Sequence, residues 1–349
     1  MMKAAVLEAF GEPLVVREVP DPTPEAHGAV MRVEANGICR SDWHAWTGNW
    51  PESMGLPHVL GHEMCGVIEE VGAATERVKP GDRVIFPFSS GDGTCRWCQR
   101  GLPHLCDDPV TPGFNSWGGF AQYVAVDYAD FNLVELPEEV SFVEGAGMGC
   151  RFMTAFHGLA DRAAVQAGEW VAVHGCGGVG LSAVQIATAL GANVIAVDIH
   201  PEKLEFAKKL GAVEVVNAGQ SNNPAREVRE LTGGGAQVSV DALGIEVTCR
   251  NAIKSLAKRG RHVQIGLTIG SDAGDLSVPI DLLVMHELQL IGSRGMPVTQ
   301  YESLLRMVAA GKLDPGSLVT STVPLEEAGA VLAAMDDYDT LGFTVIDRY

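Results

Sequence analysis

The feature that most constrains the fold is a glycine-rich turn between a strand and a helix. An apolar strand at 170–174 enters Gly175-Cys176-Gly177-Gly178-Val179-Gly180, and a helix to Leu190 follows. A second apolar strand at 194–197 then ends in Asp198. A G-x-G-x-x-G turn alone is a weak signal, but strand, turn, helix, strand and acidic residue in this order are typical of a Rossmann unit. The sequence therefore predicts a parallel sheet that binds a dinucleotide.

The turn residues have separate predicted roles. Gly175 permits the tight turn, Gly177 lets the pyrophosphate approach the backbone, and Gly180 lets the helix pack closely on its strand. The helix N-terminus, with Gly178 and Val179, offers free N–H groups and a positive dipole end to the phosphates. We expect all five residues to contact the cofactor.

Asp198 selects the cofactor in this interpretation. Its carboxylate would accept hydrogen bonds from both hydroxyls of the adenosine ribose, whereas a 2′-phosphate would bring a like charge against it. The next residues, Ile199 and His200, supply no arginine to compensate. NAD is therefore favoured over NADP. Lys203, one helical turn on, either reaches the same ribose or is a solvated lysine, and the sequence leaves both open.

Further strands and helices alternate after this unit. Apolar strands near 214–216, 238–242, 262–266 and 288–292 bring the total to six, enough for a doubly wound sheet. The C-terminal part contains two more helices and a final strand at 344–346. We predict a β-rich catalytic domain at 1–150, a dinucleotide-binding domain at 151–285, and a return to the first domain at 286–349.

Composition narrows the class of protein. At 349 residues and 46% hydrophobic content, the chain is long enough for two globular domains. It has no run of 18 apolar residues and begins directly with a strand-like segment, so we expect a cytoplasmic protein without a membrane span or signal peptide. A net charge of −19 repels phosphate backbones, which argues against nucleic-acid binding.

The candidate catalytic residues lie between Cys39 and Glu63. The segment contains Cys39-Arg40-Ser41-Asp42-Trp43-His44 and then Gly61-His62-Glu63. A single cysteine or histidine here would usually be ordinary core. Cys39 and His62 together with Cys150 downstream instead fit a catalytic zinc site, which uses three protein ligands and one open position. Thiolate and imidazole suit zinc better than magnesium or calcium.

A second group of cysteines is local. Cys95-x-x-Cys98 followed by Cys106 has the spacing of a structural zinc lobe, which should close with four ligands. Asp92, three residues before Cys95, is the natural fourth ligand because a carboxylate oxygen can bind zinc. The alternative is a vestigial, metal-free loop with reduced thiols.

These motifs together resemble the zinc-dependent medium-chain alcohol dehydrogenases over essentially the whole chain. The resemblance implies a GroES-like catalytic domain beside the Rossmann domain, with Cys39, His62 and Cys150 as catalytic zinc ligands. Glu63 would lie behind the metal as a transient ligand, and Asp42 would orient His62. Asp92 departs from the family, which usually has a cysteine there.

The resemblance also implies roles around the metal. Ser41 and His44 correspond to the proton relay, in which the proton passes from Ser41 by way of the cofactor ribose to His44. Thr154 would lie beside the nicotinamide, and Ile265 and Leu267 would also contact the cofactor. Candidate walls of the substrate pocket are three aromatic residues that could equally be core: Trp50, Phe88 and Trp117.

The predicted activity is the reversible oxidation of a primary or secondary alcohol to an aldehyde or ketone, with hydride transfer to NAD. The nearest alternative is a related zinc enzyme for polyols, threonine or another secondary alcohol. A zinc-free quinone reductase would lack Cys39, His62 and Cys150. A nucleic-acid-binding zinc module conflicts with the acidic surface, and a non-catalytic protein conflicts with the intact relay. Relatives of this length imply a homo-oligomer, a tetramer or dimer, assembled through the edge of the Rossmann sheet.

Overall fold

The computed structural model describes residues 1–49, 54–268, 274–338 and 340–349. The chain divides into two units, which we describe separately. The first contains Met1–Met153, Gly295–Ala309 and Asp314–Tyr349, and the second contains Thr154–Arg294 and Ala310–Leu313.

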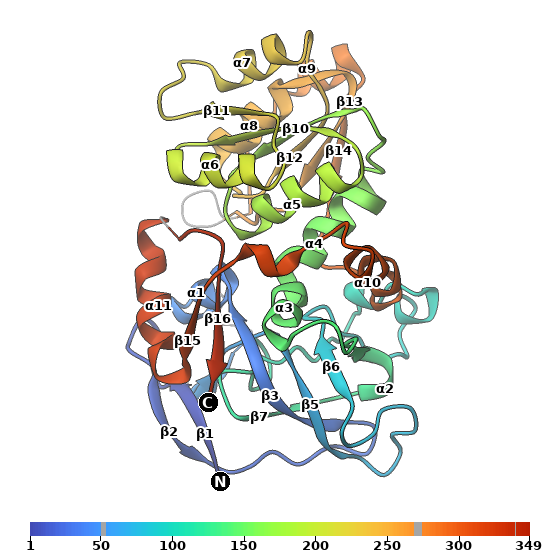
Figure 1. Ribbon diagram of the computed structural model, residues 1–349, viewed down its shortest axis with the longest axis vertical. Helices are drawn as coiled ribbons and strands as arrows, with labels where there is room; N and C mark the ends of the chain where they lie inside the picture. The colour runs from blue at the N-terminus through green and yellow to red at the C-terminus, as the bar shows by residue number, and fades with distance from the viewer. Residues whose placement is uncertain (50–53, 269–273, 339) are drawn as a thin grey trace. The chain divides into compact units, whose positions relative to one another are not determined.

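The second unit is built on a six-stranded parallel sheet (Figure 1). Its strands, in the spatial order β11-β10-β9-β12-β13-β14, are β9 (Trp170–His174), β10 (Asn193–Asp198), β11 (Glu214–Asn217), β12 (Ala236–Asp241), β13 (Leu256–Gln264) and β14 (Gln289–Gly292). The order reverses between β9 and β12, which is the arrangement of a doubly wound sheet. The predicted six-stranded Rossmann sheet is therefore confirmed.

Helices precede and connect these strands. They are η5 (His157–Arg162), α5 (Gly178–Ala189), α6 (Pro201–Lys209), α7 (Pro224–Leu231), α8 (Glu246–Lys254) and α9 (Ile280–His286). Helix α5 packs beside α6, and α7 packs beside α8. Since parallel crossovers are right-handed, reversing the strand order places these two pairs on opposite faces. The central strands can therefore be largely apolar, and β9 and β10 are buried along most of their length.

The first unit contains two sheets (Figure 1). The smaller has the order β2-β1-β4, formed by β1 (Met2–Leu7), β2 (Val15–Val19) and β4 (His58–Val59). The larger has the order β15-β16-β3-β5-β6-β8, with β7 also paired to β3. Its strands are β3 (Ala29–Ile38), β5 (Glu63–Val71), β6 (Arg83–Phe86), β7 (Tyr123–Val126), β8 (Val134–Glu135), β15 (Val319–Pro324) and β16 (Phe343–Arg348).

Short helices complete the first unit. They are α1 (Arg40–Trp46), η2 (Cys98–Arg100), η3 (Pro103–Leu105), α2 (Ala129–Asn132), α3 (Phe142–Gly147), η4 (Met148–Phe152), η7 (Val298–Gln300), α10 (Tyr301–Ala309), η8 (Pro315–Leu318), η9 (Leu325–Glu327), α11 (Ala328–Ala334) and η10 (Met335–Asp337). Helix α4 (Met153–Phe156) begins at the last residue of the first segment. The C-terminal strand β16 pairs antiparallel with β3, so the end of the chain completes the sheet begun near its start.

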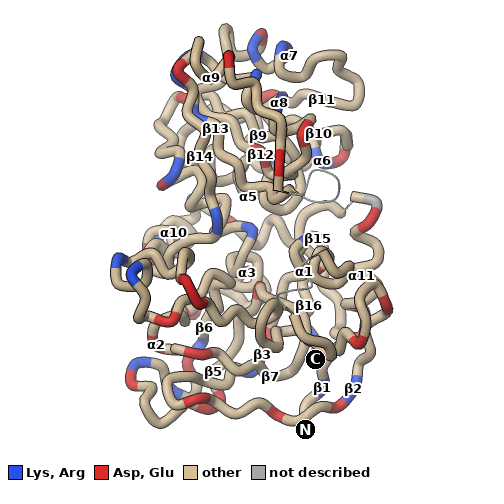
Figure 2. Tube along the Cα trace, turned by 180° about the vertical axis from the view of Figure 1, so that it is seen from behind, with Lys and Arg blue, Asp and Glu red and all other residues tan. Residues whose placement is uncertain are grey.

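Charged residues of both signs are scattered over the elements of each unit (Figure 2). Within the described ranges, none of the helices combines the length and the apolar character that a membrane crossing needs.

Candidate functional site

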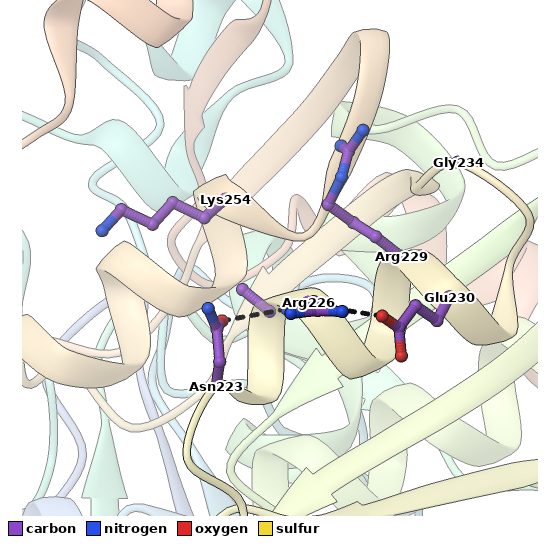
Figure 3. A pocket seen from close by; sticks show the side chains of 7 residues that line it. Asn223, Arg226, Arg229, Glu230, Gly234 and Lys254 are labelled. Atoms are coloured by element: carbon purple, nitrogen blue, oxygen red, sulfur yellow. Dashed lines mark hydrogen bonds and ion pairs between the residues drawn. The ribbon is translucent and has the colours of Figure 1, made fainter.

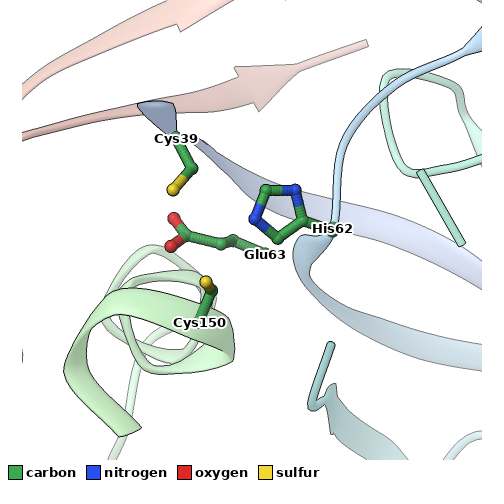
Figure 4. A group of neighbouring side chains, drawn as sticks. All are labelled: Cys39, His62, Glu63 and Cys150. Carbon is green, nitrogen blue, oxygen red and sulfur yellow. The ribbon is translucent and has the colours of Figure 1, made fainter. Parts of the chain in front are cut away.

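The predicted catalytic ligands come from three segments of the first unit. Strand β3 leads into Cys39, His62 immediately precedes β5, and Cys150 lies in the π-helical turn η4. Because Gly37 pairs with Glu63 across β3 and β5, the ends of these strands lie side by side. The ligand atoms of Cys39, His62, Glu63 and Cys150 all lie within 4.8 Å of one another, and all four residues are buried (Figure 4).

Asp42 orients two of these ligands. Its Oδ2 accepts a hydrogen bond from the Cys39 backbone N–H at 2.8 Å, and its Oδ1 lies 2.8 Å from His62 Nδ1. Oδ1 also accepts from Gly61 N–H at 3.1 Å. A carboxylate on one ring nitrogen fixes the tautomer and leaves the other nitrogen available to a metal. The orienting role expected of Asp42 is thus matched by its contacts.

His62 presents the free nitrogen that a metal requires. Its Nε2 is buried and forms no well-aligned hydrogen bond with any residue that the structure describes. Burial opposes the charged imidazolium, but the charge and hydrogen bond of Asp42, together with Cys39, raise the pKa of His62 well above its usual value. A buried ring nitrogen facing two thiols and a carboxylate fits zinc by its donor chemistry.

The two thiols differ in acidity. A hydrogen bond from Cys150 lowers the pKa of Cys39 well below that of a free thiol, and the same bond raises the pKa of Cys150 well above it. The pair therefore shares protons that a metal ion would displace, because only thiolates bind zinc.

Glu63 is held by the residue that follows Cys150. Its carboxylate accepts from the Arg151 backbone N–H at 3.1 Å and Nε at 2.9 Å, and it pairs with the same guanidinium through Nη2. Burial raises the pKa of Glu63 to about 7, against the opposing charge of Arg151. Arg151 also lies over the Phe343 ring, 3.9 Å from its centroid. No sequence motif indicates this pairing of Glu63 with Arg151.

The two predicted relay residues lie on α1. Ser41 is partly exposed, and His44 is buried with its Nδ1 3.2 Å from Asn49 Nδ2. Burial and the charge of Arg40 lower the pKa of His44 to about 4. A neutral imidazole at pH 7 can accept a proton, which is what a relay terminus requires.

The predicted pocket aromatics are placed differently from one another. Phe88 packs edge-on against the His62 ring, with the centroids 5.9 Å apart. Phe114, which the sequence analysis missed, is closer, at 4.7 Å. Trp117 has 36% of its surface exposed. Trp50 lies outside the described residues.

The second group, Asp92, Cys95, Cys98 and Cys106, also converges within 4.8 Å. The Cys95 and Cys106 sulfurs are 3.8 Å apart, and Cys106 Sγ is 3.4 Å from Asp92 Oδ1. A Cβ at Gly91 would lie 2.6 Å from Cys98 Sγ, so the loop needs glycine there. We call residues 92–106 the cysteine lobe.

Asp92 also holds the cysteine lobe together by hydrogen bonds. It accepts from the Thr94 and Cys95 backbone N–H groups at 2.9 and 3.1 Å and from the Thr94 hydroxyl at 2.6 Å. These bonds, led by the hydroxyl, hold the pKa of Asp92 well below its usual range. Backbone N–H groups, Cys98 first, lower the pKa of Cys95 to about 7. An ionised carboxylate beside an acidic thiol fits a fourth zinc ligand.

In the second unit, the glycine turn has the geometry expected of a dinucleotide site. Gly175 has a φ of +88°, and a Cβ on Gly180 would lie 1.7 Å from the Gly175 carbonyl oxygen. A Cβ on Gly177, the residue before α5, would meet nothing within 4 Å. Tight turn, close helix packing and open space for a phosphate are therefore all present.

Asp198 lies at the end of β10, beside this turn. Its Oδ2 accepts from the Cys176 backbone N–H at 2.6 Å, and its Oδ1 accepts from His200 N–H at 2.9 Å. Each carboxylate oxygen has a second lone pair for a ligand hydroxyl.

A pocket of about 520 Å³ lies at this end of the sheet. Gly175 and Asp198 line it, but so do residues that the sequence analysis missed, among them Ile199, Ala218, Ser221, Ile245, Val247, Thr248 and Asn251. They follow the carboxyl ends of β10, β11 and β12, where ligands of doubly wound sheets bind. The predicted strand ends could have pointed to these loops.

A neighbouring, smaller pocket shares Asn223 and Lys254 with the pocket that Gly175 and Asp198 line (Figure 3). Its other cations have partners: Arg226 pairs with Glu230 at 2.7 Å, and Arg229 donates to the Leu256 carbonyl. Asn223 caps α7 by accepting from Arg226 N–H.

The remaining predicted cofactor contacts do not line the larger pocket. The Thr154 hydroxyl is buried without a hydrogen-bond partner among the described residues. Lys203 is buried in α6, Ile265 is half-buried, and Leu267 is 66% exposed. Their roles remain predictions.

Known proteins resemble the chain over its whole length. Residues 25–138 match the family described as "Alcohol dehydrogenase GroES-like domain", and residues 178–310 match "Zinc-binding dehydrogenase". An alcohol dehydrogenase of Geobacillus stearothermophilus is 37% identical over 96% of both chains. An NAD-dependent alcohol dehydrogenase of Sulfurisphaera tokodaii is 34% identical over 99% of both. The structure of alcohol dehydrogenase TADH from Thermus sp. ATN1 has a TM-score of 0.91 and 32% identity, with full coverage of both chains. The predicted GroES-like domain is thus confirmed.

Proposed function

The chain belongs to the zinc-dependent medium-chain alcohol dehydrogenases, and we propose that Cys39, His62 and Cys150 hold its catalytic zinc. It is an NAD-dependent oxidoreductase that interconverts an alcohol with an aldehyde or ketone. The observation that carries the site assignment is the convergence of two thiols on a buried imidazole whose Nε2 forms no well-aligned hydrogen bond with the described residues.

Zinc held by these residues supplies Lewis acidity. Zinc can lower the pKa of a bound water from about 16 to about 7, and an alcohol hydroxyl should respond similarly. That is on the order of 12 kcal/mol at about 1.4 kcal/mol per pKa unit, more than one side-chain base could supply. The protein's part is to fix the ligands, and Asp42 does so for Cys39 and His62 together.

Proton transfer is the role we propose for Ser41 and His44. The Ser41 hydroxyl can pass on the alcohol proton, and the neutral His44 ring can receive one. Burial lowers the pKa of His44 to about 4, so its ring is neutral at pH 7 and keeps a nitrogen lone pair that can accept a hydrogen bond. General acid–base help of this kind is typically worth about 10²–10⁴-fold in rate.

Glu63 is proposed as the transient ligand behind the metal. Its carboxylate is within 4.8 Å of the other ligand atoms, and Arg151 holds it there by several hydrogen bonds. A move toward the metal would break part of this ion pair. Arg151 would therefore oppose ligation by Glu63.

NAD is proposed to bind at the glycine turn with its ribose on Asp198. Replacing Asp198 by Gly should relax the preference for NAD over NADP, because the like charge facing a 2′-phosphate is removed. The ratio of kcat/KM for the two cofactors measures this. An unchanged ratio would count against the ribose assignment.

The substrate is a small alcohol, aldehyde or ketone, and a polyol, threonine or other secondary alcohol is the competing class. Absorbance at 340 nm with NAD and a panel of primary, secondary and polyhydroxy alcohols tests the activity and separates these classes. Absence of turnover with every alcohol, by enzyme loaded with zinc, would overturn the proposed function.

The cysteine lobe is proposed to hold a second zinc through Asp92, Cys95, Cys98 and Cys106. Its support is the same convergence within 4.8 Å and the ionised state of Asp92. Cytoplasmic location is proposed from the sequence alone.

We also propose a homo-oligomer, a dimer or tetramer, assembled through the edge of the Rossmann sheet. Strand β14 is the last strand of the sheet, and Leu290 on it is 48% exposed. Helix α9 buries none of its residues, and its apolar side chains Val284 and Met285 are 70% and 77% exposed. An unpaired strand edge beside exposed apolar side chains fits a second copy of the chain. Analytical ultracentrifugation tests this, with Leu290→Lys expected to release monomers.

A further inference from the structure

Asp241, the last residue of β12, is a hydrogen-bond hub with no role in the site so far described. Its side chain is fully buried. Oδ1 accepts from Leu243 N–H at 3.0 Å, Gly244 N–H at 3.2 Å and the Thr248 hydroxyl at 3.0 Å. Oδ2 accepts from Gln264 Nε2 at 2.9 Å. The carboxylate therefore fixes the loop that follows its own strand and contacts the neighbouring strand β13.

The same hub fixes the loop after β13. The Asp241 carbonyl oxygen accepts from the Ile265 and Gly266 backbone N–H groups at 3.1 and 2.9 Å. Gln264 Nε2, already bonded to the Asp241 carboxylate, also donates to the Gly266 carbonyl at 2.8 Å. Two loops at the carboxyl edge of the sheet are thus tied to one residue.

A carboxylate is an unusual side chain at a buried position whose role is purely structural. Its donors are backbone N–H groups, a hydroxyl and an amide, and within the described parts of the second unit no Lys or Arg forms an ion pair with it. Burial of a carboxylate is costly, and well-packed apolar groups often stabilise a fold at least as well. An ionised acceptor does, however, hold several N–H groups in fixed directions more strongly than a neutral one.

The loops that Asp241 fixes lie at the cofactor end of the sheet. Strand β12 neighbours β9 where the strand order reverses, the position at which doubly wound sheets bind ligands. A Cβ on Gly175 would lie 3.2 Å from the Leu243 Cβ, so Leu243 packs directly on the glycine turn. Ile245 and Thr248, which follow, line the pocket that also contains Gly175 and Asp198.

We propose that Asp241 is a positioning residue for NAD: it holds the segment 243–248 as a preformed wall of the cofactor pocket, to which Ile245, Val247 and Thr248 contribute. It also fixes the 265–266 backbone, which packs against Gly244 in that segment. The inference rests on the proposed NAD site in the second unit. A preformed wall raises affinity for the cofactor, because no binding free energy is spent on ordering the loops. Asp241 need not touch the cofactor to have this effect.

Asp241→Asn tests the proposal with little change of shape. Asparagine keeps one acceptor oxygen, but its NH₂ group must face either Gln264 Nε2 or the loop N–H groups, which are all donors. We expect the Kd for NADH, measured by fluorescence titration of the zinc-loaded enzyme, to rise about tenfold or more, equivalent to about 1.4 kcal/mol. The KM for NAD should rise with it while kcat changes less. Hydrogen exchange at the 243 and 244 amides should accelerate.

Ser239→Ala is the matched control. Ser239 lies two residues earlier on the same strand, is equally buried, and bonds His262 Nδ1 at 2.9 Å. It should lower the melting temperature and leave the NADH Kd unchanged. If Asp241→Asn also lowers only the melting temperature, with Kd within twofold of wild type, Asp241 is merely structural and the proposal is wrong.

A second variant covers the case in which Asp241→Asn does not fold. Gln264→Met keeps a similar side-chain volume but removes the N–H donor that bonds both Asp241 and the Gly266 carbonyl. It should weaken NADH binding several-fold. Unchanged NADH binding would refute the proposal. A wild-type enzyme that binds NADPH but not NADH would overturn the NAD assignment, and the same variants titrated with NADPH would then decide the role of Asp241. Binding of neither would overturn both.

Discussion

The buried cluster around Cys39 takes its ligands from three distant segments, whereas the cysteine lobe takes all four from the single segment 92–106. The buried ligands are oriented by residues that are not ligands themselves, Asp42 and Arg151. In the lobe, the proposed ligand Asp92 is also the residue that holds the loop. The surrounding fold therefore sets the geometry of the buried cluster. The geometry of the cysteine lobe depends on its own proposed ligands and on any metal that they bind.

Removing a buried ligand should have the largest effect. Cys39→Ala or Cys150→Ala should abolish catalytic zinc and lower kcat/KM by more than about a hundredfold, since loss of an outer partner alone costs about 10–100-fold. Zinc per chain by mass spectrometry and the 340 nm assay measure this. Cys249→Ala, a buried thiol outside both clusters, is the control. A fully active Cys39→Ala enzyme would refute the ligand assignment.

Removing the charge that orients the buried ligands should have the next largest effect. Asp42→Asn should reduce zinc affinity or activity about 10–100-fold, because His62 loses the carboxylate that fixes its tautomer. Competition with a chelator measures the affinity. If the Asp42→Asn variant binds zinc as tightly as wild type, the rest of the fold positions His62 without the carboxylate. The orienting role of Asp42 would then be wrong.

The lobe should respond in stability and metal content rather than in chemistry. Wild-type protein should contain about two zinc ions per chain, and Asp92→Ala about one, with a lower melting temperature and a smaller loss of kcat than Cys39→Ala. Asp92→Cys should restore or tighten the second zinc, since it supplies a fourth thiolate. One zinc per wild-type chain would instead support the metal-free loop.

Acidification should have the smallest effect, a loss of folding stability through His44 near the buried cluster but not through Asp92 in the cysteine lobe. The folded pKa of His44, about 4, lies below the usual value of about 6.5, so protonation favours the unfolded chain. The stability that neutral His44 preserves is fully present above pH 6.5 and is lost as pH falls toward 4. Asp92, with its pKa held low, stays ionised over this range. His44→Gln should flatten the fall in unfolding free energy between pH 7 and 5, as measured by urea titration; an unchanged slope would contradict this.

The sequence by itself determined the features that depend on short-range chemistry. The strand–turn–helix–strand pattern ending in Asp198 fixed the Rossmann sheet, because glycine positions and apolar periodicity are local properties. The spacing of Cys95, Cys98 and Cys106 predicted a cluster that the fold does bring together. Ligand type and family resemblance group Cys39 and His62 with Cys150, and the pairing of β3 with β5 brings the chain at Cys39 close to the chain at His62.

Only the tertiary structure decided which distant side chains meet. The Glu63–Arg151 pair joins residues 88 positions apart, Phe114 rather than Trp117 packs on His62, and Asp241 ties together two loops that share no motif. Such contacts arise from strand register and helix packing, which add many weak interactions over the whole fold. A residue's type shows what bonds it can form, but only the packed chain determines the partner that is within reach.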